Sequence, residues 1–209
     1  MSSFSEMRPY DSRAIAFKNT PNYIDKIIGR GEKFNIQNID INSEYSDFGS
    51  IIKDKKIYFT SSRNTDRKSY GWNDEPFLDI YSSTINEKGS FLEPNLLEDL
   101  NSKFHEGILS FSADGNTIYF TRESFYEKEF EKSEENKNKY GQSYIYKATK
   151  LKDKFNIIES LDINDPSFSN KNPMVSPDGK HLYFSSNRPD GFGMYDIYRA
   201  SINDDGTLS

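Results

Sequence analysis

The chain holds few side chains that could do acid–base or nucleophilic chemistry. Its two histidines include His105, which stands beside Glu106, and an imidazole next to a carboxylate can act as a general base. The serine pairs, such as Ser185-Ser186, lack the Gly-x-Ser-x-Gly elbow of serine hydrolases. We therefore expect no catalytic residue and no enzyme activity, and we keep His105 and Glu106 as candidate binding residues.

Metal and cofactor chemistry finds no matching motif. The chain has no cysteine, which excludes thiolate catalysis and cysteine-ligated zinc. The acidic turns Asp190-Gly191 and Asp204-Asp205-Gly206 lack the spaced carboxylates and the distal glutamate of a calcium loop. No glycine-rich phosphate loop or dinucleotide fingerprint is present. We expect neither a metal nor a cofactor, and we interpret the acidic turns as turns.

A three-strand unit recurs along the chain, and a repeat with a steady period is the strongest guide to architecture. Its second strand appears as Ile57-Tyr58-Phe59-Thr60, Ile118-Tyr119-Phe120-Thr121 and Leu182-Tyr183-Phe184-Ser185. A turn precedes the later copies of this strand, as Asp114-Gly115 and Asp178-Gly179. The third strand appears as Asp79-Ile80-Tyr81, Tyr144-Ile145-Tyr146 and Asp196-Ile197-Tyr198.

An arginine follows the second strand in each copy, at Arg63, Arg122 and Arg188. A residue that recurs in register favours a structural role, and a guanidinium can bridge carboxylates and backbone carbonyls. Asp79 and Asp196, which open the third strands, are the expected partners. The middle copy departs from this pattern, because Ser143 or Tyr144 stands there.

The run from Ser176 to Arg188 (Ser-Pro-Asp-Gly-Lys-His-Leu-Tyr-Phe-Ser-Ser-Asn-Arg) resembles the WD-repeat-like β-propeller of the TolB type. Asn42 to Gly49, Trp72 to Tyr81 and Phe104 to Gly107 make the surroundings similar to the propeller segment of OmpA-family envelope proteins of Bacteroidota. The resemblance covers about residues 20–209. Such proteins also carry helical repeats, a small β-sandwich and a peptidoglycan-binding domain, none of which is in this sequence.

The resemblance implies an all-β fold: a propeller of four-stranded antiparallel blades, about three of them visible and the ring incomplete. We expect blades at about residues 47–100, 106–163 and 171–209. Residues 33–41 would form a clasp or outer strand, so that the propeller fragment covers residues 33–209. Closed rings commonly have four to eight blades, and therefore we expect at least one further blade.

Residues 1–32 form a lead-in or linker. Residues 1–20 are polar and irregular by composition, and residues 21–28 have apolar spacing that fits a short helix. This helix could pack on the propeller flank or end a preceding helical-repeat domain. Between Arg122 and Gln142, Glu, Lys and Asn predominate, which is typical of a solvated, mobile loop.

Charge and hydropathy limit the kinds of partner that we expect this chain to bind. The net charge is −6 and no basic patch gathers, so nucleic acid is not expected. No apolar run approaches the ~20 residues of a membrane span. The first residues lack the pattern of a signal peptide. The resemblance implies a periplasmic, outer-membrane-associated parent whose partners are other envelope proteins, and peptidoglycan through a domain outside this sequence.

Two classes of function remain. The first is a non-enzymatic scaffold or protein-interaction module, with a role in envelope integrity or in the secretion and gliding machinery. The second is a propeller hydrolase or a glycan-binding module with a site at the central channel. Trp72 and Tyr70 join His105 and Glu106 as candidate residues for binding at a rim or the channel, because exposed aromatic rings stack on sugars and on protein side chains.

Overall fold

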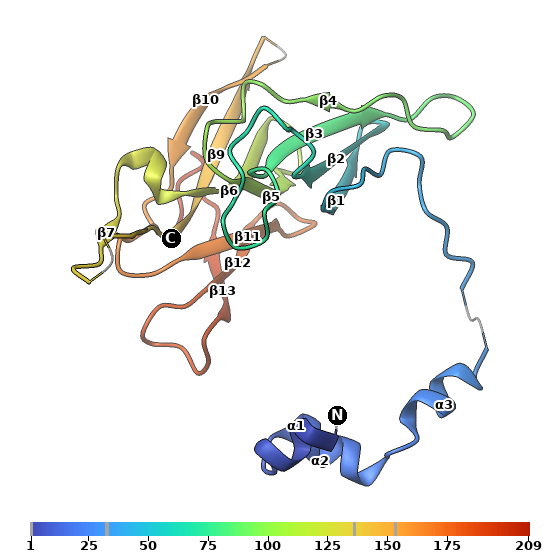
Figure 1. Cartoon of the computed structure of the whole chain (residues 1–209). Coiled ribbons are helices and arrows are strands. Elements are labelled where there is room, and N and C mark those ends of the chain that lie inside the picture. The colour runs from blue at the N-terminus through green and yellow to red at the C-terminus, as the bar shows by residue number, and fades with distance from the viewer. Residues whose placement is uncertain (1, 32–33, 136, 153) are drawn as a thin grey trace. The chain divides into compact units, whose positions relative to one another are not determined.

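The computed structural model describes residues 2–31, 34–135, 137–152 and 154–209. The chain divides into two compact units, Met1–Ile39 and Asp40–Ser209, called here the helical unit and the β unit. The division falls a few residues after the expected end of the lead-in at residue 32. Figure 1 shows the α-helices in the first unit and the strands in the second.

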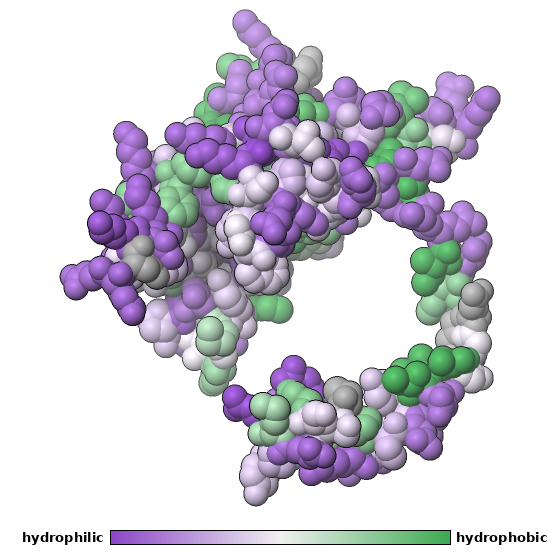
Figure 2. Space-filling view, viewed as in Figure 1, coloured by the Kyte–Doolittle hydropathy of each residue, from purple (hydrophilic) through white to green (hydrophobic). Residues whose placement is uncertain are grey.

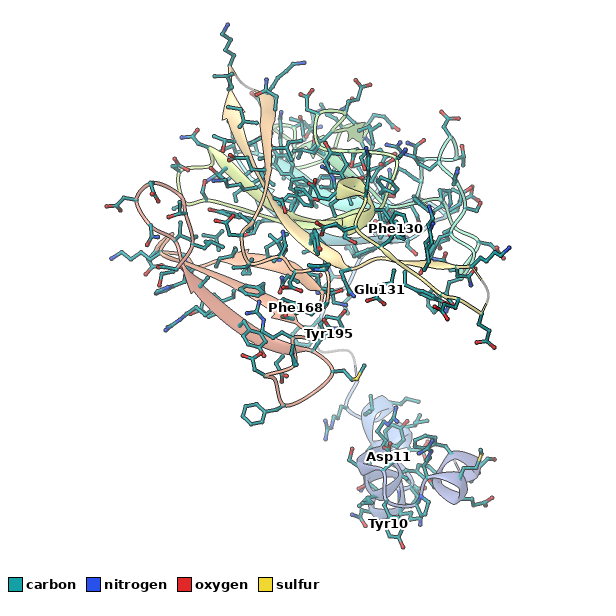
Figure 3. The ribbon with its side chains drawn as sticks, turned by 90° about the vertical axis from the view of Figure 1, so that its left-hand side faces the viewer. Tyr10, Asp11, Phe130, Glu131, Phe168 and Tyr195 are labelled. Atoms are coloured by element: carbon teal, nitrogen blue, oxygen red, sulfur yellow. The ribbon has the colours of Figure 1, made fainter. Side chains whose placement is uncertain are left out.

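The helical unit contains α1 (Ser2–Met7), α2 (Ser12–Asn19) and α3 (Tyr23–Ile28). Asp11, labelled in Figure 3, caps α2 by accepting a hydrogen bond from the backbone N–H of Arg13. The prediction of an irregular segment at residues 1–20 was therefore wrong, because α1 and α2 form there and this local cap stabilises the start of α2. The expected helix at residues 21–28 forms as α3, whose isoleucines remain exposed.

The β unit contains two four-stranded antiparallel sheets and one three-stranded antiparallel sheet. The first sheet is formed by β1 (Asp47–Lys53), β2 (Lys56–Ser61), β3 (Asp79–Thr84) and β4 (Asn95–Leu96). The second is formed by β5 (Glu106–Phe111), β6 (Thr117–Glu123), β9 (Ser143–Leu151) and β10 (Lys154–Ser160). The third is formed by β11 (Asn170–Val175), β12 (His181–Ser186) and β13 (Asp196–Ser201). These sheets confirm the expected all-β architecture of propeller-like blades.

Each sheet begins with a strand that is bulged at the same place. The register shifts between Phe48 and Ile51 in β1, between Gly107 and Leu109 in β5, and between Lys171 and Met174 in β11. A bulge bends a strand and strengthens its twist. The repeated bulges therefore shape the first strands alike.

Packing between sheets forms the core. One apolar cluster joins the first and second sheets and includes Ile80, Phe111 and Phe120. Another joins the second and third sheets and includes Ile145, Val175 and Phe184. The visible surface of the β unit is largely hydrophilic (Figure 2), as its polar composition requires.

Two segments differ from expectation. Residues 34–41 form no strand, and Phe34 and Ile36 are exposed, so the expected clasp or outer strand is absent there; residue 33 lies outside the described residues. The place beside β13 is taken by Leu208, which bridges Ile202 as Phe91 bridges Ile85 in the first sheet. The start of an outer strand therefore already occupies this edge of the third sheet.

The segment between Arg122 and Gln142 is also more ordered than a solvated loop. It contains a 3₁₀ turn, η1 (Ser124–Glu127), and a short hairpin of β7 (Glu131–Lys132) and β8 (Lys139–Tyr140). Phe125 stacks on Phe104 and Phe130. These rings give the insertion a small apolar centre that its overall charge conceals.

Candidate functional site

The arginine after each second strand reaches back to the first strand of its own sheet. Arg122 bonds Glu106 at 2.7 Å, and Arg63 bonds Asp47 at 2.6 Å. Arg188 makes the matching bond to the amide oxygen of Asn170 at 3.1 Å. Each arginine thus ties the first strand of a sheet to the second.

The expected partners, Asp79 and Asp196, lie elsewhere. Asp79 is fully buried and pairs with Arg67 at 2.8 Å, while Asp196 accepts hydrogen bonds from the backbone N–H groups of Phe192 and Gly193. The prediction of these pairs was wrong because the arginines turn toward the first strand and not toward the third. In the middle sheet, Ser143 or Tyr144 stands where the other copies have an aspartate, and the partner of Arg122 is Glu106 from the first strand.

Aromatic rings surround these guanidinium groups. The Cζ atom of Arg122 lies 4.2 Å from the ring centroid of Tyr126 and 5.1 Å from that of Tyr146. Arg188 lies in the same way over Phe168, which Figure 3 labels beside the third sheet, at 4.9 Å. A guanidinium stacks favourably on such rings, so the surroundings are those of a structural clamp.

The Asp-Gly turns are structural as well. Asp114 accepts hydrogen bonds from the Ser112 hydroxyl and the Asn116 backbone N–H, and Asp178 accepts equivalent bonds from Ser176 and Lys180. Gly115 and Gly179 follow with φ of 74° and 73°, a conformation that glycine adopts without strain. These carboxylates therefore stabilise turns and are unavailable as ligands.

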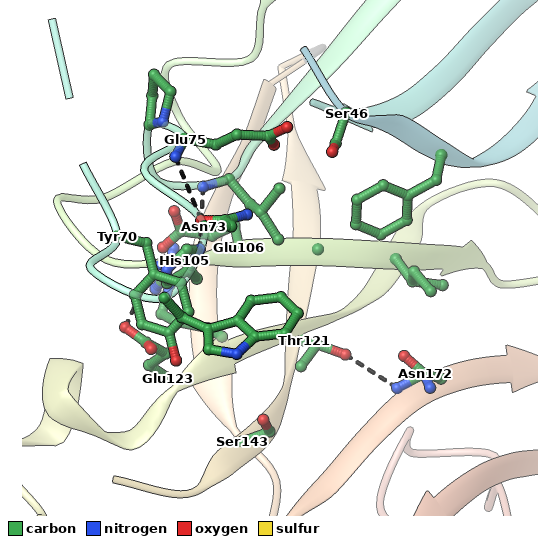
Figure 4. Close-up of a pocket in the computed structure, with 17 residues that line it drawn as sticks. Ser46, Tyr70, Asn73, Glu75, His105, Glu106, Thr121, Glu123, Ser143 and Asn172 are labelled. Atoms are coloured by element: carbon green, nitrogen blue, oxygen red, sulfur yellow. Dashed lines mark hydrogen bonds and ion pairs between the residues drawn. The ribbon is translucent and has the colours of Figure 1, made fainter. Parts of the chain in front are cut away.

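One pocket of about 420 Å³ is lined by residues of the two four-stranded sheets and of the three-stranded sheet. Phe48 comes from β1, Ile108 from β5 and Asn172 from β11, so the first strands meet at this pocket. The Asn172 backbone N–H donates to the Thr121 hydroxyl at 3.0 Å, which joins the second and third sheets at its wall (Figure 4). The pocket is thus held in place by the packing of the blades.

All the candidate binding residues predicted from sequence line this pocket. Tyr70 and Trp72 come from the long loop after β2, and Trp72 is 85% exposed. The ring of His105 stacks on Phe77 at 4.2 Å and meets Tyr70 edge-on at 4.9 Å. The tryptophan is therefore free to contact a ligand, while the histidine is packed among rings.

Glu106 borders the pocket, but its side chain is buried and has little surface there. It is 1% exposed, and it accepts hydrogen bonds from Arg122 and from the Ser102 backbone N–H at 3.0 Å. Burial raises its pKa, and Arg122 and Ser102 oppose that effect. Since these partners take up its carboxylate, Glu106 is not the free acid or base that its place beside His105 indicated.

His105 is held neutral by its surroundings. Its Nδ1 accepts the Leu78 backbone N–H at 3.1 Å, and its Nε2 is buried without a hydrogen-bond partner among the described residues. Burial lowers the pKa of His105 to about 4. Nearby Glu123 accepts the His105 backbone N–H at 3.3 Å, and burial raises its pKa. At neutral pH this imidazole is an acceptor fixed by the fold.

A pH dependence of stability follows. His105 protonates in the unfolded chain near its ordinary pKa of 6.5 but only near 4 in the folded protein, so stability falls as the pH drops through this window. We expect the wild type to lose about 2 kcal/mol more than His105→Asn between about pH 7.5 and about pH 4.5. Asparagine keeps an acceptor for the Leu78 N–H but does not titrate. Urea unfolding of both proteins at each pH measures the difference, and parallel losses would contradict it.

Other residues of the pocket were not among the candidates predicted from the sequence. Phe48, Thr121, Glu123 and Asn172 all line the pocket. Gly49 and Asn172 both have positive φ, at 66° and 57°, and mark the bulges of their strands. Asp47-Phe48-Gly49 is in register with Glu106-Gly107-Ile108, and this match to the candidate Glu106 was the available signal for Phe48.

The described residues do not form a metal site or a membrane-spanning helix. Within the described ranges, no group of three or more His, Asp or Glu side chains could hold a metal ion. No described helix is long and apolar enough to cross a membrane.

Comparisons with known proteins describe only the fold. No known family profile and no curated protein matches the chain. It is similar to the solved structure of a putative TolB from Agrobacterium tumefaciens, with 20% identity and a TM-score of 0.45, over 74% of this chain and 44% of that one. It is also similar to TolB from Acinetobacter baumannii, with 21% identity and a TM-score of 0.42, over 74% of this chain and 28% of that one. A puromycin hydrolase mutant matches at 11% identity and a TM-score of 0.46, over 79% of this chain and 22% of that one. The chain spans less than half the length of each, and the assignment of blades rests on its own sheets.

Proposed function

We propose that this chain is a non-enzymatic propeller module that binds a segment of a partner protein at the pocket between its first strands. The main support for this proposal is the pocket. Its wall combines exposed aromatic rings with charged groups that already pair with other groups of the fold. The pocket therefore offers apolar contact without a free nucleophile–base pair.

The lining fits a side chain of a partner protein. Phe48 and Trp72 present exposed rings, and Ile108 and Leu78 add apolar wall. Asn172 is the kind of polar group that can fix an incoming backbone. Pockets with apolar walls and a few placed polar groups are typical binding sites, and aromatic residues are enriched where protein partners bind.

We further propose that the parent protein works in the cell envelope. The repeat and its surroundings resemble the propeller of OmpA-family envelope proteins of Bacteroidota, which supports a periplasmic, outer-membrane-associated setting. The partners would be other envelope proteins, with peptidoglycan bound by another domain of the parent. A role in envelope integrity or in the secretion and gliding machinery would follow from such contacts.

A glycan is the second candidate ligand, and the exposed indole of Trp72 favours it. Flat aromatic faces stack on sugar rings, and Tyr70 lies in the same pocket wall. A hydrolase would in addition need a nucleophile and a base in reach of each other. The buried His105 and the paired Glu106 do not supply that arrangement.

The only tryptophan of the chain gives a direct test. Trp72 lies at the pocket, so its emission should shift to shorter wavelength when a ligand covers it. We expect an array of synthetic peptides with apolar or aromatic residues to contain ligands that produce this shift. A set of peptidoglycan fragments, titrated in parallel, tests the glycan.

Phe48→Ala should weaken the binding of such a peptide about tenfold, because one exposed aromatic contact is worth ~1–2 kcal/mol. Phe192→Ala is the matched control, since Phe192 is fully exposed outside the pocket. Equal binding by both variants would place the ligand elsewhere. A response to peptidoglycan fragments alone would replace the protein segment by a glycan.

A further inference from the structure

The charges in the lining of the pocket do not balance. Among the described residues of the lining, the carboxylates are those of Glu75, Glu106 and Glu123, and the only lysine or arginine is Arg122. His105 adds no positive charge at neutral pH, because burial lowers its pKa to about 4. Three carboxylates and one guanidinium leave a formal charge of −2 in the lining.

Two of these charges neutralise each other within the fold. The Nε atom of Arg122 lies 2.7 Å from a carboxylate oxygen of Glu106, and the two side chains are 1% and 0% exposed. A ligand that enters the pocket can therefore use neither of them. The remaining negative charge belongs to Glu75 and Glu123.

Glu75 keeps its charge at neutral pH and is fixed in the wall. It accepts the Ser62 hydroxyl at 2.5 Å, and this hydrogen bond lowers the pKa of its carboxyl group. The Tyr70 backbone N–H donates to the Glu75 carbonyl at 2.7 Å. One folded loop therefore presents both a carboxylate and an aromatic ring to the pocket.

Glu123, at the end of β6, is a partly buried carboxylate without a cationic partner. Its side chain accepts the His105 backbone N–H at 3.3 Å, and none of the ion pairs formed by the described residues includes it. Burial raises its pKa. A cation beside a desolvated carboxylate favours the charged form, so Glu123 would gain from a cation that enters the pocket.

Aromatic rings lie in the same lining. Tyr70 meets the ring of His105 edge-on at 4.9 Å, so Tyr70 and Glu123 both contact the same histidine (Figure 4). Trp72 and Phe48 line the pocket with rings that are 85% and 41% exposed. Ammonium and guanidinium groups are attracted to aromatic faces, so these rings suit a cationic side chain with an apolar stem.

The chain uses the same combination for one of its own side chains. Arg122 pairs with Glu106, and its Cζ atom lies 4.2 Å from the ring centroid of Tyr126. A carboxylate and an aromatic ring therefore hold a guanidinium group inside the second sheet. Glu123 and Tyr70 offer these two groups to a ligand.

From these contacts we propose that the partner segment inserts a lysine or arginine side chain into the pocket, where the charge pairs with Glu123 and the stem packs on the rings of Tyr70 and Trp72. This inference rests on the proposed function, since it requires a protein segment at the pocket. The volume of about 420 Å³ is typical of ligand sites. A basic segment would also complement the net charge of −6 of the chain.

Neutral replacements in the peptide test the proposal. The starting material is a set of peptides that shift the emission of Trp72. Each lysine of a peptide is exchanged for norleucine and each arginine for citrulline, which keep the length of the side chain but not its charge. We expect one exchange in each peptide to weaken binding about tenfold in calorimetry, because hydrogen bonds to charged groups are the stronger ones.

Glu123→Gln tests the residue that receives the charge. Glutamine keeps an acceptor for the His105 N–H, and the variant should weaken the basic peptide about tenfold but leave the affinity of the exchanged peptide unchanged. Glu131→Gln is the matched control, since it removes one exposed carboxylate outside the pocket and should change neither affinity.

The outcomes separate this inference from the proposed function. Peptides that bind equally after every exchange, or a Glu123→Gln variant that weakens both peptides alike, would overturn the cationic ligand and leave the protein-binding pocket in place. No emission shift with any peptide would overturn both. If Glu123→Gln unfolds, as judged by circular dichroism, the exchanges measured on the wild type decide the question alone.

Discussion

Replacing Arg122 with methionine is expected to lower the free energy of unfolding by about 3–5 kcal/mol, because the change leaves a buried carboxylate without its partner. The side chains of Arg122 and Glu106 are 1% and 0% exposed and lie 2.7 Å apart. Arg122 also donates to the Leu100 carbonyl at 2.7 Å and so ties the end of the first blade to the second. Urea unfolding monitored by circular dichroism measures the loss.

Arg188→Met is the matched control for this prediction. Arg188 occupies the same repeat position but bonds the neutral amide of Asn170, so its removal leaves no buried charge. We expect it to cost roughly 1 kcal/mol, the usual net value of a hydrogen bond. The double variant Arg122→Met/Glu106→Leu should recover much of the single loss, since it removes both charges. Equal losses for Arg122→Met and Arg188→Met would contradict the account of a buried ion pair.

Gly49→Ala should destabilise the β unit by about 2–4 kcal/mol, through backbone strain and overpacking together. Gly49 has φ of 66°, and a Cβ there would lie 2.8 Å from Cγ1 of Ile108. The clash falls between β1 and β5, where the first two sheets approach each other beside the pocket. Urea unfolding again gives the magnitude, and loss of the Trp72 response would report damage to the pocket.

Gly206→Ala separates the two causes. Gly206 has φ of 78° but no heavy atom within 4 Å of the position of a Cβ, so only backbone strain applies. We expect it to cost about 1 kcal/mol. Adding Ile108→Ala to Gly49→Ala should relieve the clash but not the strain. If Gly49→Ala proved no worse than Gly206→Ala, close approach of the first strands would be refuted.

The blades could be predicted because their signals are local and repeated. Ile118-Tyr119-Phe120-Thr121 alternates between the two faces of its sheet, and the turn at Asp114-Gly115 precedes it. Each copy confirms the register of the others. The second and third strands of each copy followed from this pattern, whereas their grouping into four-stranded antiparallel blades was what the resemblance implied.

The partners of the arginines could not be predicted in the same way. Arg63 is separated from both Asp47 and Asp79 by about the same length of chain, and sequence alone does not show which carboxylate it faces. Residues 34–41 illustrate a second limit. Phe34-Asn35-Ile36 has the same sequence as Phe155-Asn156-Ile157 of β10, and this match indicated a strand. A strand also needs a neighbouring strand to pair with, and the sequence does not show whether one is present.

Several residues of the pocket could be predicted from the sequence, but their burial and their hydrogen-bond partners could not. His105, Tyr70 and Trp72 stood out by type, yet they are distant in sequence from Asn172, which completes the wall from the third sheet. Glu106 was expected to be available for binding, but it is buried and paired with Arg122. The sequence shows that Glu106 follows His105, but it does not show that Arg122 contacts Glu106. Burial and pairing are decided by the assembly of the sheets.

Mass analysis of a bound peptide tests the central claim most directly. A peptide that shifts the emission of Trp72 is incubated with the protein for much longer than binding requires. The peptide is then recovered, and its mass is measured by mass spectrometry. We expect stoichiometric binding in calorimetry, intact peptide after recovery, and about tenfold weaker binding to Phe48→Ala. Recovery of cleaved peptide, with cleavage lost in His105→Asn, would contradict it and would make this pocket the active site of a hydrolase.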